Sequence, residues 1–78
     1  MIGKNIKDER NNFINNIAYL RKKNGLSKKE MANVLNISVY VLNKIEKGEL
    51  PKKLSVEIVF NLQKYFKISP EKQFKKMK

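Results

Sequence analysis

The sequence predicts an all-α fold of five helices, and three observations support this. Apolar residues recur three and four positions apart along most of the chain, which is the spacing of one helix face. Serine, asparagine, glycine and proline stand between these stretches, where they can begin or end helices. Only residues 37–42 are locally strand-like, and no second segment alternates with a period of two to pair with them. Because a lone strand leaves its backbone unsatisfied, we expect a helix there as well.

The first helix is expected over residues 8–24. Arg21 and the two lysines after it lie at its C-terminal end, where cations complement the helix dipole. Gly25 is placed to end the helix in the left-handed conformation. The apolar face of this helix consists of Phe13, Ile14, Ile17 and Leu20.

The second helix is expected over residues 28–35, between a capping box and an asparagine. The Ser27 hydroxyl can accept the backbone N–H of Glu30, while the glutamate can accept the N–H of Ser27. Asn36 follows where the helix must stop, because asparagine tolerates a positive φ angle. The apolar stripe consists of Met31, Val34 and Leu35, with the small Ala32 beside it.

The third helix is expected over residues 39–46, with Ser38 as its N-cap and Gly48 as its stop. The β-branched residues here lower helix propensity by only a few tenths of a kcal/mol each. Burying Leu42 and Ile45 contributes roughly 1.5–3 kcal/mol apiece. Burial therefore outweighs the local strand propensity.

Two further helices are expected in the last third of the chain. Ser55 can cap the fourth, and Ser69, Pro70 and Glu71 begin the fifth with an N-cap, a proline at the first position and an acid in the first turn. The fourth helix carries Val56, Val59, Phe60, Leu62, Tyr65 and Phe66, and the fifth carries Phe74 and Met77.

The composition limits the kind of protein. Seventy-eight residues suit one domain, which we expect to span 1–78 with flexible ends at 1–7 and 76–78. The chain has no cysteine and no histidine, so we expect no metal, no cofactor and no enzyme activity. No apolar run approaches the roughly 20 residues of a membrane span, and no signal-peptide pattern opens the chain. A cytoplasmic location is therefore the expectation.

The charge indicates a polyanionic partner. The 18 Lys and Arg residues outnumber the 7 Asp and Glu residues and give a net charge of +11. Such a basic domain favours nucleic acid over a membrane surface. The alternative is a lysine-rich surface without such a partner, because net charge reports on association and not on fold.

The second and third helices and the short turn between them form a helix-turn-helix pattern. Ala32 is where the two helices cross closely, so a small side chain is needed there. Ile37, Leu42 and Ile45 hold the third helix against the second, with Met31 and Leu35 opposite. This arrangement leaves one exposed face of the third helix free to meet a ligand: Ser38, Val39, Tyr40, Asn43 and Lys44.

The sequence resembles the lambda-repressor-like, or XRE-type, helix-turn-helix family of phage and bacterial transcriptional regulators over about residues 13–74. The matching stretches are Ile17-x-x-Leu20-Arg21, Gly25-Leu26-Ser27-x-x-Glu30-Met31-Ala32-x-x-Leu35, Ile37-Ser38-x-x-x-Leu42-x-x-Ile45-Glu46-x-Gly48 and Phe66-Lys67-Ile68-Ser69. The resemblance implies a compact five-helix DNA-binding domain.

The resemblance also implies roles for individual residues. Arg21 and Glu46 match an ion pair that ties the first helix to the end of the recognition helix. Many relatives dimerise around the last helix, which here would involve Phe66, Ile68 and Phe74. Base contacts in the major groove fall to Ser38, Val39, Tyr40, Asn43 and Lys44, and phosphate contacts to Lys28, Lys47, Lys52 and Lys53.

The functional expectation is a repressor that binds double-stranded DNA as a dimer, in the cytoplasm of a bacterium or a phage-infected cell. Val39 and Val41 stand where the family usually has polar residues. Three roles are therefore open for Val39 and its neighbour Tyr40: contact with thymine methyls and phosphate, internal packing, or contact with a protein. The rival interpretation is a protein-interaction module or antitoxin that binds its partner through Val39-Tyr40-Val41. The weakest is a binder of membrane surfaces.

Overall fold

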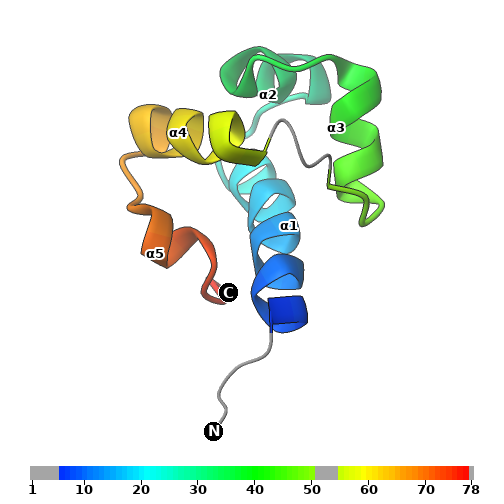
Figure 1. Cartoon of the computed structure of the whole chain (residues 1–78). Helices are drawn as coiled ribbons and strands as arrows, with labels where there is room; N and C mark the ends of the chain where they lie inside the picture. The colour runs from blue at the N-terminus through cyan, green and yellow to red at the C-terminus, as the bar shows by residue number, and fades with distance from the viewer. Residues whose placement is uncertain (1–5, 51–54, 78) are drawn as a thin grey trace, which may run out of the picture.

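The structure is a computed structural model that describes residues 6–50 and 55–77. Within these ranges it contains five α-helices and no strand, which confirms the all-α prediction (Figure 1). The helices are α1 (Ile6–Lys23), α2 (Lys28–Leu35), α3 (Val39–Glu46), α4 (Ser55–Phe66) and α5 (Pro70–Gln73).

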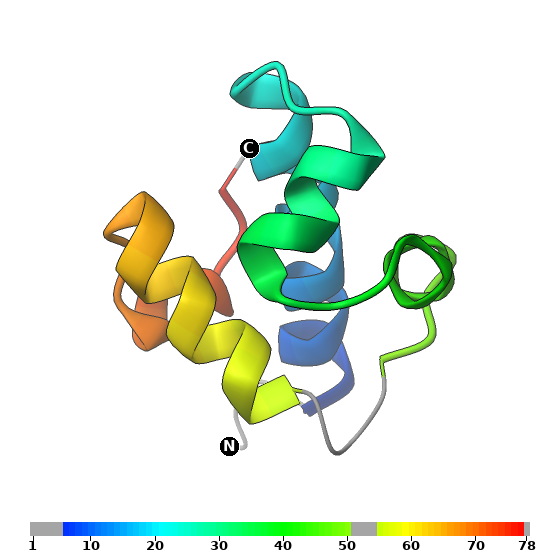
Figure 2. The same ribbon diagram turned by 90° about the horizontal axis from the view of Figure 1, so that it is seen from above.

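The helices gather around α1. Helix α2 packs against α3 and α4, α1 packs against α3 and α5, and α4 packs against α5. Helices α3 and α4 lie on opposite sides of α1 in both views (Figures 1 and 2). The molecule therefore presents α3 and α4 on two separate faces.

The predicted limits of α2 and α3 are confirmed, together with the signals that set them. The backbone N–H of Glu30 donates to Ser27 Oγ at 3.1 Å, and the N–H of Ser27 donates to Glu30 Oε1 at 2.8 Å. Asn36 adopts φ 60°, as the turn requires. Ser38 Oγ accepts the N–H of Val41 at 3.1 Å and begins α3.

Helix α1 begins two residues before the predicted start and ends one residue before the predicted end. Helix ends commonly shift by this much, because one terminal hydrogen bond decides them. Gly25, at φ +66°, donates to Lys22 O, and Leu26 donates to Arg21 O, which together close the helix in a Schellman motif. Of the ends expected to be flexible, residues 1–5 and 78 lie outside the described ranges.

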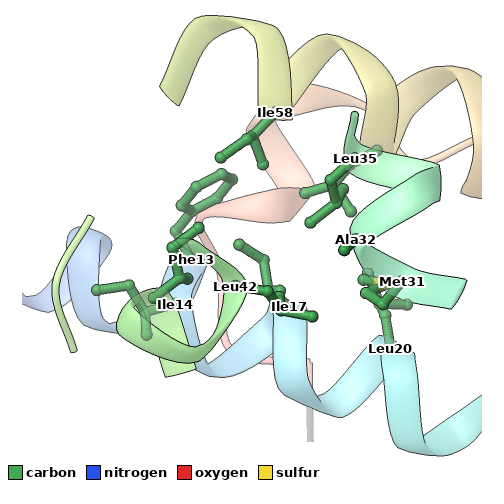
Figure 3. Packing of buried hydrophobic residues seen from close by; sticks show 11 residues of the cluster. Phe13, Ile14, Ile17, Leu20, Met31, Ala32, Leu35, Leu42 and Ile58 are labelled. Carbon is green, nitrogen blue, oxygen red and sulfur yellow. The ribbon is translucent and has the colours of Figure 1, made fainter. Parts of the chain in front are cut away.

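The core is one cluster to which helices α1 to α4 all contribute. Figure 3 shows side chains from these helices converging on a shared interior. Leu42 and Ile45 have no exposed surface, and Ala32 is 2% exposed. The other buried apolar residues are Phe13, Ile14, Ile17, Leu20, Met31, Leu35, Ile58 and Leu62.

The face that α4 buries differs from the predicted one. Ile58, which was not expected in the core, is fully buried one turn before Leu62. Apolar residues occur on both sides of this helix at helical spacing, so the pattern alone does not decide which side packs inward. Val59 and Phe66 are partly buried, whereas Val56, Phe60 and Tyr65 are exposed.

Helix α5 is shorter than expected and stops at Gln73. Ser69 lies in the extended N-cap conformation before Pro70, as predicted, but its side chain makes no capping hydrogen bond. Phe74 lies beyond the helix and stacks on Phe13, with 4.7 Å between the ring centroids. The helix ends where side-chain amides of α1 donate hydrogen bonds to the backbone carbonyl groups of this segment.

Those amides belong to a polar network that the sequence analysis did not anticipate. Asn16 Nδ2 donates to Gln73 O and Lys75 O, both at 2.7 Å, and Asn12 Nδ2 donates to Phe74 O at 3.2 Å. The fully buried Gln73 side chain donates to the carbonyls of Val59 and Ile68, each at 3.0 Å. This network ties the C-terminal segment to α1 and α4.

An ion pair joins α1 to the end of α3. Arg21 Nε lies 2.8 Å from Glu46 Oε2, and Arg21 Nη2 donates to Glu46 Oε1 at 3.3 Å. Both side chains are largely covered, at 15% and 13% exposure. Arg21 also donates to Leu26 O at 3.3 Å, so one guanidinium holds the end of α1 and the end of α3 together.

Replacing Asn16 with alanine should destabilise the fold. The substitution leaves two carbonyl groups of the C-terminal segment without their donor, which we expect to cost about 1–3 kcal/mol in the free energy of unfolding. Urea denaturation measures this cost. Asn15→Ala is the matched control, because Asn15 is exposed on the same helix. Equal stability of the two variants would contradict the role of Asn16.

Replacing Glu46 with glutamine should also destabilise the fold, because it removes the charge that Arg21 faces in a largely covered site. We expect a loss of about 1–3 kcal/mol in the free energy of unfolding, measured in urea. In the control Glu49→Gln, the affected carboxylate is 66% exposed and 3.7 Å from Lys44, so stability should change little. A similar loss in both variants would argue against a structural role of the Arg21–Glu46 pair.

Candidate nucleic-acid interface

The outward face of α3 follows from its packing. Leu42 and Ile45 point into the core, and the helical period then turns residues 39, 40, 43, 44 and 47 toward solvent. Tyr40 is 68% exposed and Val39 is 39% exposed. The Ser38 residue is exposed as well, although its Oγ already accepts the cap hydrogen bond.

Val41 is arranged differently from its two neighbours. It is half-buried and packs against the core cluster. Of the three apolar residues that open α3, only Tyr40 therefore presents most of its surface outward, and Val39 presents about two fifths. The apolar edge of the helix is narrower than the sequence indicated.

Tyr40 and Lys44 form a pair on this face. Lys44 Nζ lies 5.1 Å from the centroid of the Tyr40 ring and 3.7 Å from Glu49 Oε1. Hydrogen bonding to the Tyr40 side chain raises the pKa of Lys44, with smaller contributions from the charges of Tyr40 and Glu49. Lys44 therefore presents its ammonium group beside the phenol ring.

Lys28 links the start of α2 to the middle of α3. Its Nζ donates to Asn43 Oδ1 at 2.9 Å, which brings a residue expected at phosphate beside one expected at a base. The amide nitrogen of Asn43 remains as a donor. No local sequence pattern indicated this contact, because the partners are 15 residues apart and meet only through the crossing of α2 and α3.

The charge around α3 is mainly positive. Lys28, Lys44 and Lys47 surround the helix, and Lys28 and Lys47 are exposed. Glu30 is used in the capping box, which leaves Glu49 as the acid beside Lys44. Lys52 and Lys53, also expected to contact phosphate, lie outside the described residues. Such a surface suits a polyanion.

The described residues contain no group of three or more His, Cys, Asp or Glu side chains that could hold a metal ion. Within the same ranges, no helix is both long and apolar enough to cross a membrane. Phe66, Ile68 and Phe74, which the resemblance placed at a dimer contact, are half-buried and pack against the core of the monomer.

Comparison with known families agrees with this geometry. A family model described as helix-turn-helix matches residues 17–73, a range that contains all of α2, α3, α4 and α5. Comparisons with curated proteins and with solved structures gave no match. The family match covers well over half of the chain and confirms the resemblance drawn from the sequence. The chain therefore belongs to the lambda-repressor-like, XRE-type helix-turn-helix family of DNA-binding regulators.

Proposed function

We propose that this protein is a sequence-specific transcriptional repressor that acts in the cytoplasm by inserting α3 into the major groove of DNA as a dimer. The observation that carries the proposal is the outward face of α3, on which Asn43, Lys44 and Tyr40 stand together while Lys28 reaches them from α2. A major groove admits one α-helix, and phosphates line both of its edges.

Polar donors on this face supply the base contacts of the proposal. Asn43 offers its amide nitrogen, and Lys44 offers an ammonium group; both suit the acceptor atoms on purine edges. Val39 can meet a thymine methyl group, and the Tyr40 hydroxyl can meet a phosphate or a base. Ser38 lies at the start of the same face, beside the first turn of α3.

Lysines around this face supply the phosphate contacts of the proposal. Lys28 and Lys47 flank α3, and we assign Lys52 and Lys53 the same role from the sequence. A dimer would read two half-sites spaced by about one helical turn, roughly 34–36 Å. Such contacts position the protein on DNA, whereas the base contacts select the sequence.

A second candidate function is the binding of a partner protein, as in an antitoxin. The observation that favours it is the exposure of Tyr40, at 68%, beside Val39. The double substitution Val39→Ala with Tyr40→Ala distinguishes the two functions. A pull-down of a partner that is lost in this variant while DNA binding persists would support the second candidate.

The double substitution Asn43→Ala with Lys44→Ala should weaken sequence-specific binding by about tenfold or more, because it removes two donors to base edges. A gel-shift titration against the promoter region of the protein's own gene measures the change. Asn15→Ala with Lys22→Ala is the matched control, since it removes the same residue types from an exposed part of α1. Equal losses, or no wild-type band at low salt, would refute the proposal.

DNA binding should depend steeply on salt, because phosphate contacts release counterions. Lys47→Ala should reduce the slope of log Kobs against log salt concentration by about one unit. Lys22→Ala carries the same change of charge on α1, outside the proposed interface, and should leave the slope nearly unchanged. A slope that responds equally to both substitutions would show that total charge, and not a contact at Lys47, sets the binding.

A further inference from the structure

An exposed apolar pair on α4 has no role in the proposed DNA interface. Val56 is 77% exposed and Phe60 is 64% exposed, and the two are one helical turn apart on the same side of α4. This helix lies on the opposite side of the molecule from α3 (Figures 1 and 2). A phenylalanine that is mostly open to water beside another apolar side chain indicates a contact surface.

Charges of opposite sign flank Phe60 along the helix. Glu57 is three residues before it and Lys64 is four residues after it, so both lie on neighbouring parts of the same face. Both residues are exposed. Glu57 Oε2 accepts a hydrogen bond from Asn36 Nδ2 at 3.1 Å, which holds the carboxylate at the edge of this face.

This arrangement is self-complementary. If a second α4 packs antiparallel across a two-fold axis near Phe60, each Glu57 comes opposite the Lys64 of the other copy. The two Phe60 rings then meet at the centre, where their contact removes apolar surface from water. We propose that the Val56–Phe60 face of α4 is the surface through which two copies of this chain associate.

A second copy fits this face better than an acidic protein does. The net charge of +11 would attract an acidic partner, but Glu57 would repel it at the contact itself. A second copy provides a partner for Glu57 and for Lys64 at once. The long-range repulsion between two basic chains is screened by salt, whereas the apolar contact is not.

The inference goes beyond the operator-bound dimer of the proposed function, because two copies joined through α4 carry their α3 helices on the outer sides of the pair. Phe66, Ile68 and Phe74 are half-buried against the core of the monomer, so they offer less free surface than Phe60. Because α3 lies on the opposite side, association through α4 leaves both α3 helices uncovered. Self-association can therefore be measured without DNA, and it can fail while DNA binding succeeds.

Sedimentation equilibrium of the full chain without DNA, at moderate salt, tests the inference. The wild-type chain should show a reversible monomer–dimer equilibrium, and Phe60→Glu should raise the dimer dissociation constant by about a hundredfold. Tyr65→Glu is the matched control: Tyr65 is also an exposed aromatic residue of α4, at 57%, but it lies about 140° around the helix from Phe60. This control should dimerise like the wild type.

Charge reversal tests the antiparallel arrangement. Glu57→Lys and Lys64→Glu should each weaken the dimer, and the two together should restore it, because the pair is then rebuilt with exchanged signs. Circular dichroism checks that each variant is folded. Failure of the double variant to recover would overturn the antiparallel pairing.

Two outcomes would overturn the inference as a whole. The first is a wild-type chain that remains monomeric at every concentration, which would leave this face to another kind of partner. The second is an equal effect of Phe60→Glu and Tyr65→Glu. Binding of the Phe60→Glu variant to a short DNA duplex is measured in parallel. This measurement tests the proposed groove binding by α3 independently of self-association through α4.

Discussion

The burial of Leu42 and Ile45 is the constraint on which the proposed interface depends. These two side chains are fully enclosed, and they fix the rotation of α3 about its own axis. A rotation by one residue, about 100°, would carry Tyr40 and Asn43 away from solvent and bring others forward. The Ser38 cap fixes where the helix begins, and the Arg21–Glu46 pair holds its end, so rotation and position are both determined.

Features set by interactions between residues close in the sequence were predicted correctly, whereas features set by contacts between distant residues were not. Ser27, Glu30 and the positive φ of Asn36 set the limits of α2, and Ser38 sets the start of α3; these signals lie within a few residues of the helix ends and were predictable. Contacts with helices distant in the sequence decide which side of α4 packs inward. The sequence alone did not decide it, because apolar residues occur on both sides of this helix. The Asn16–Gln73 bond spans 57 residues, so no local pattern indicated that these polar side chains would be buried.

Three of the seven acids have defined partners within the fold. Glu30 closes a cap, Glu46 meets Arg21, and Glu57 meets Asn36. Hydrogen bonds and one covered ion pair hold these three carboxylates at defined positions, and most of the lysines whose exposure is described are exposed. Fold stability therefore depends on a small number of placed acids, whereas the attraction for a polyanion depends on the summed charge of the lysines.

The α4 face and the outward face of α3 are separate surfaces, but Glu57 links the α4 face to the turn between α2 and α3. Its carboxylate flanks Phe60 and also accepts a hydrogen bond from Asn36, the residue whose left-handed conformation joins α2 to α3. A second contact, from Asn61 Nδ2 to Leu35 O at 3.0 Å, holds α4 to the end of α2. A change at Glu57 therefore acts on the turn as well as on the α4 face, whereas a change at the exposed Phe60 ring acts on the face alone. These two hydrogen bonds provide one route for coupling between association and DNA binding, and any such coupling is equal in both directions.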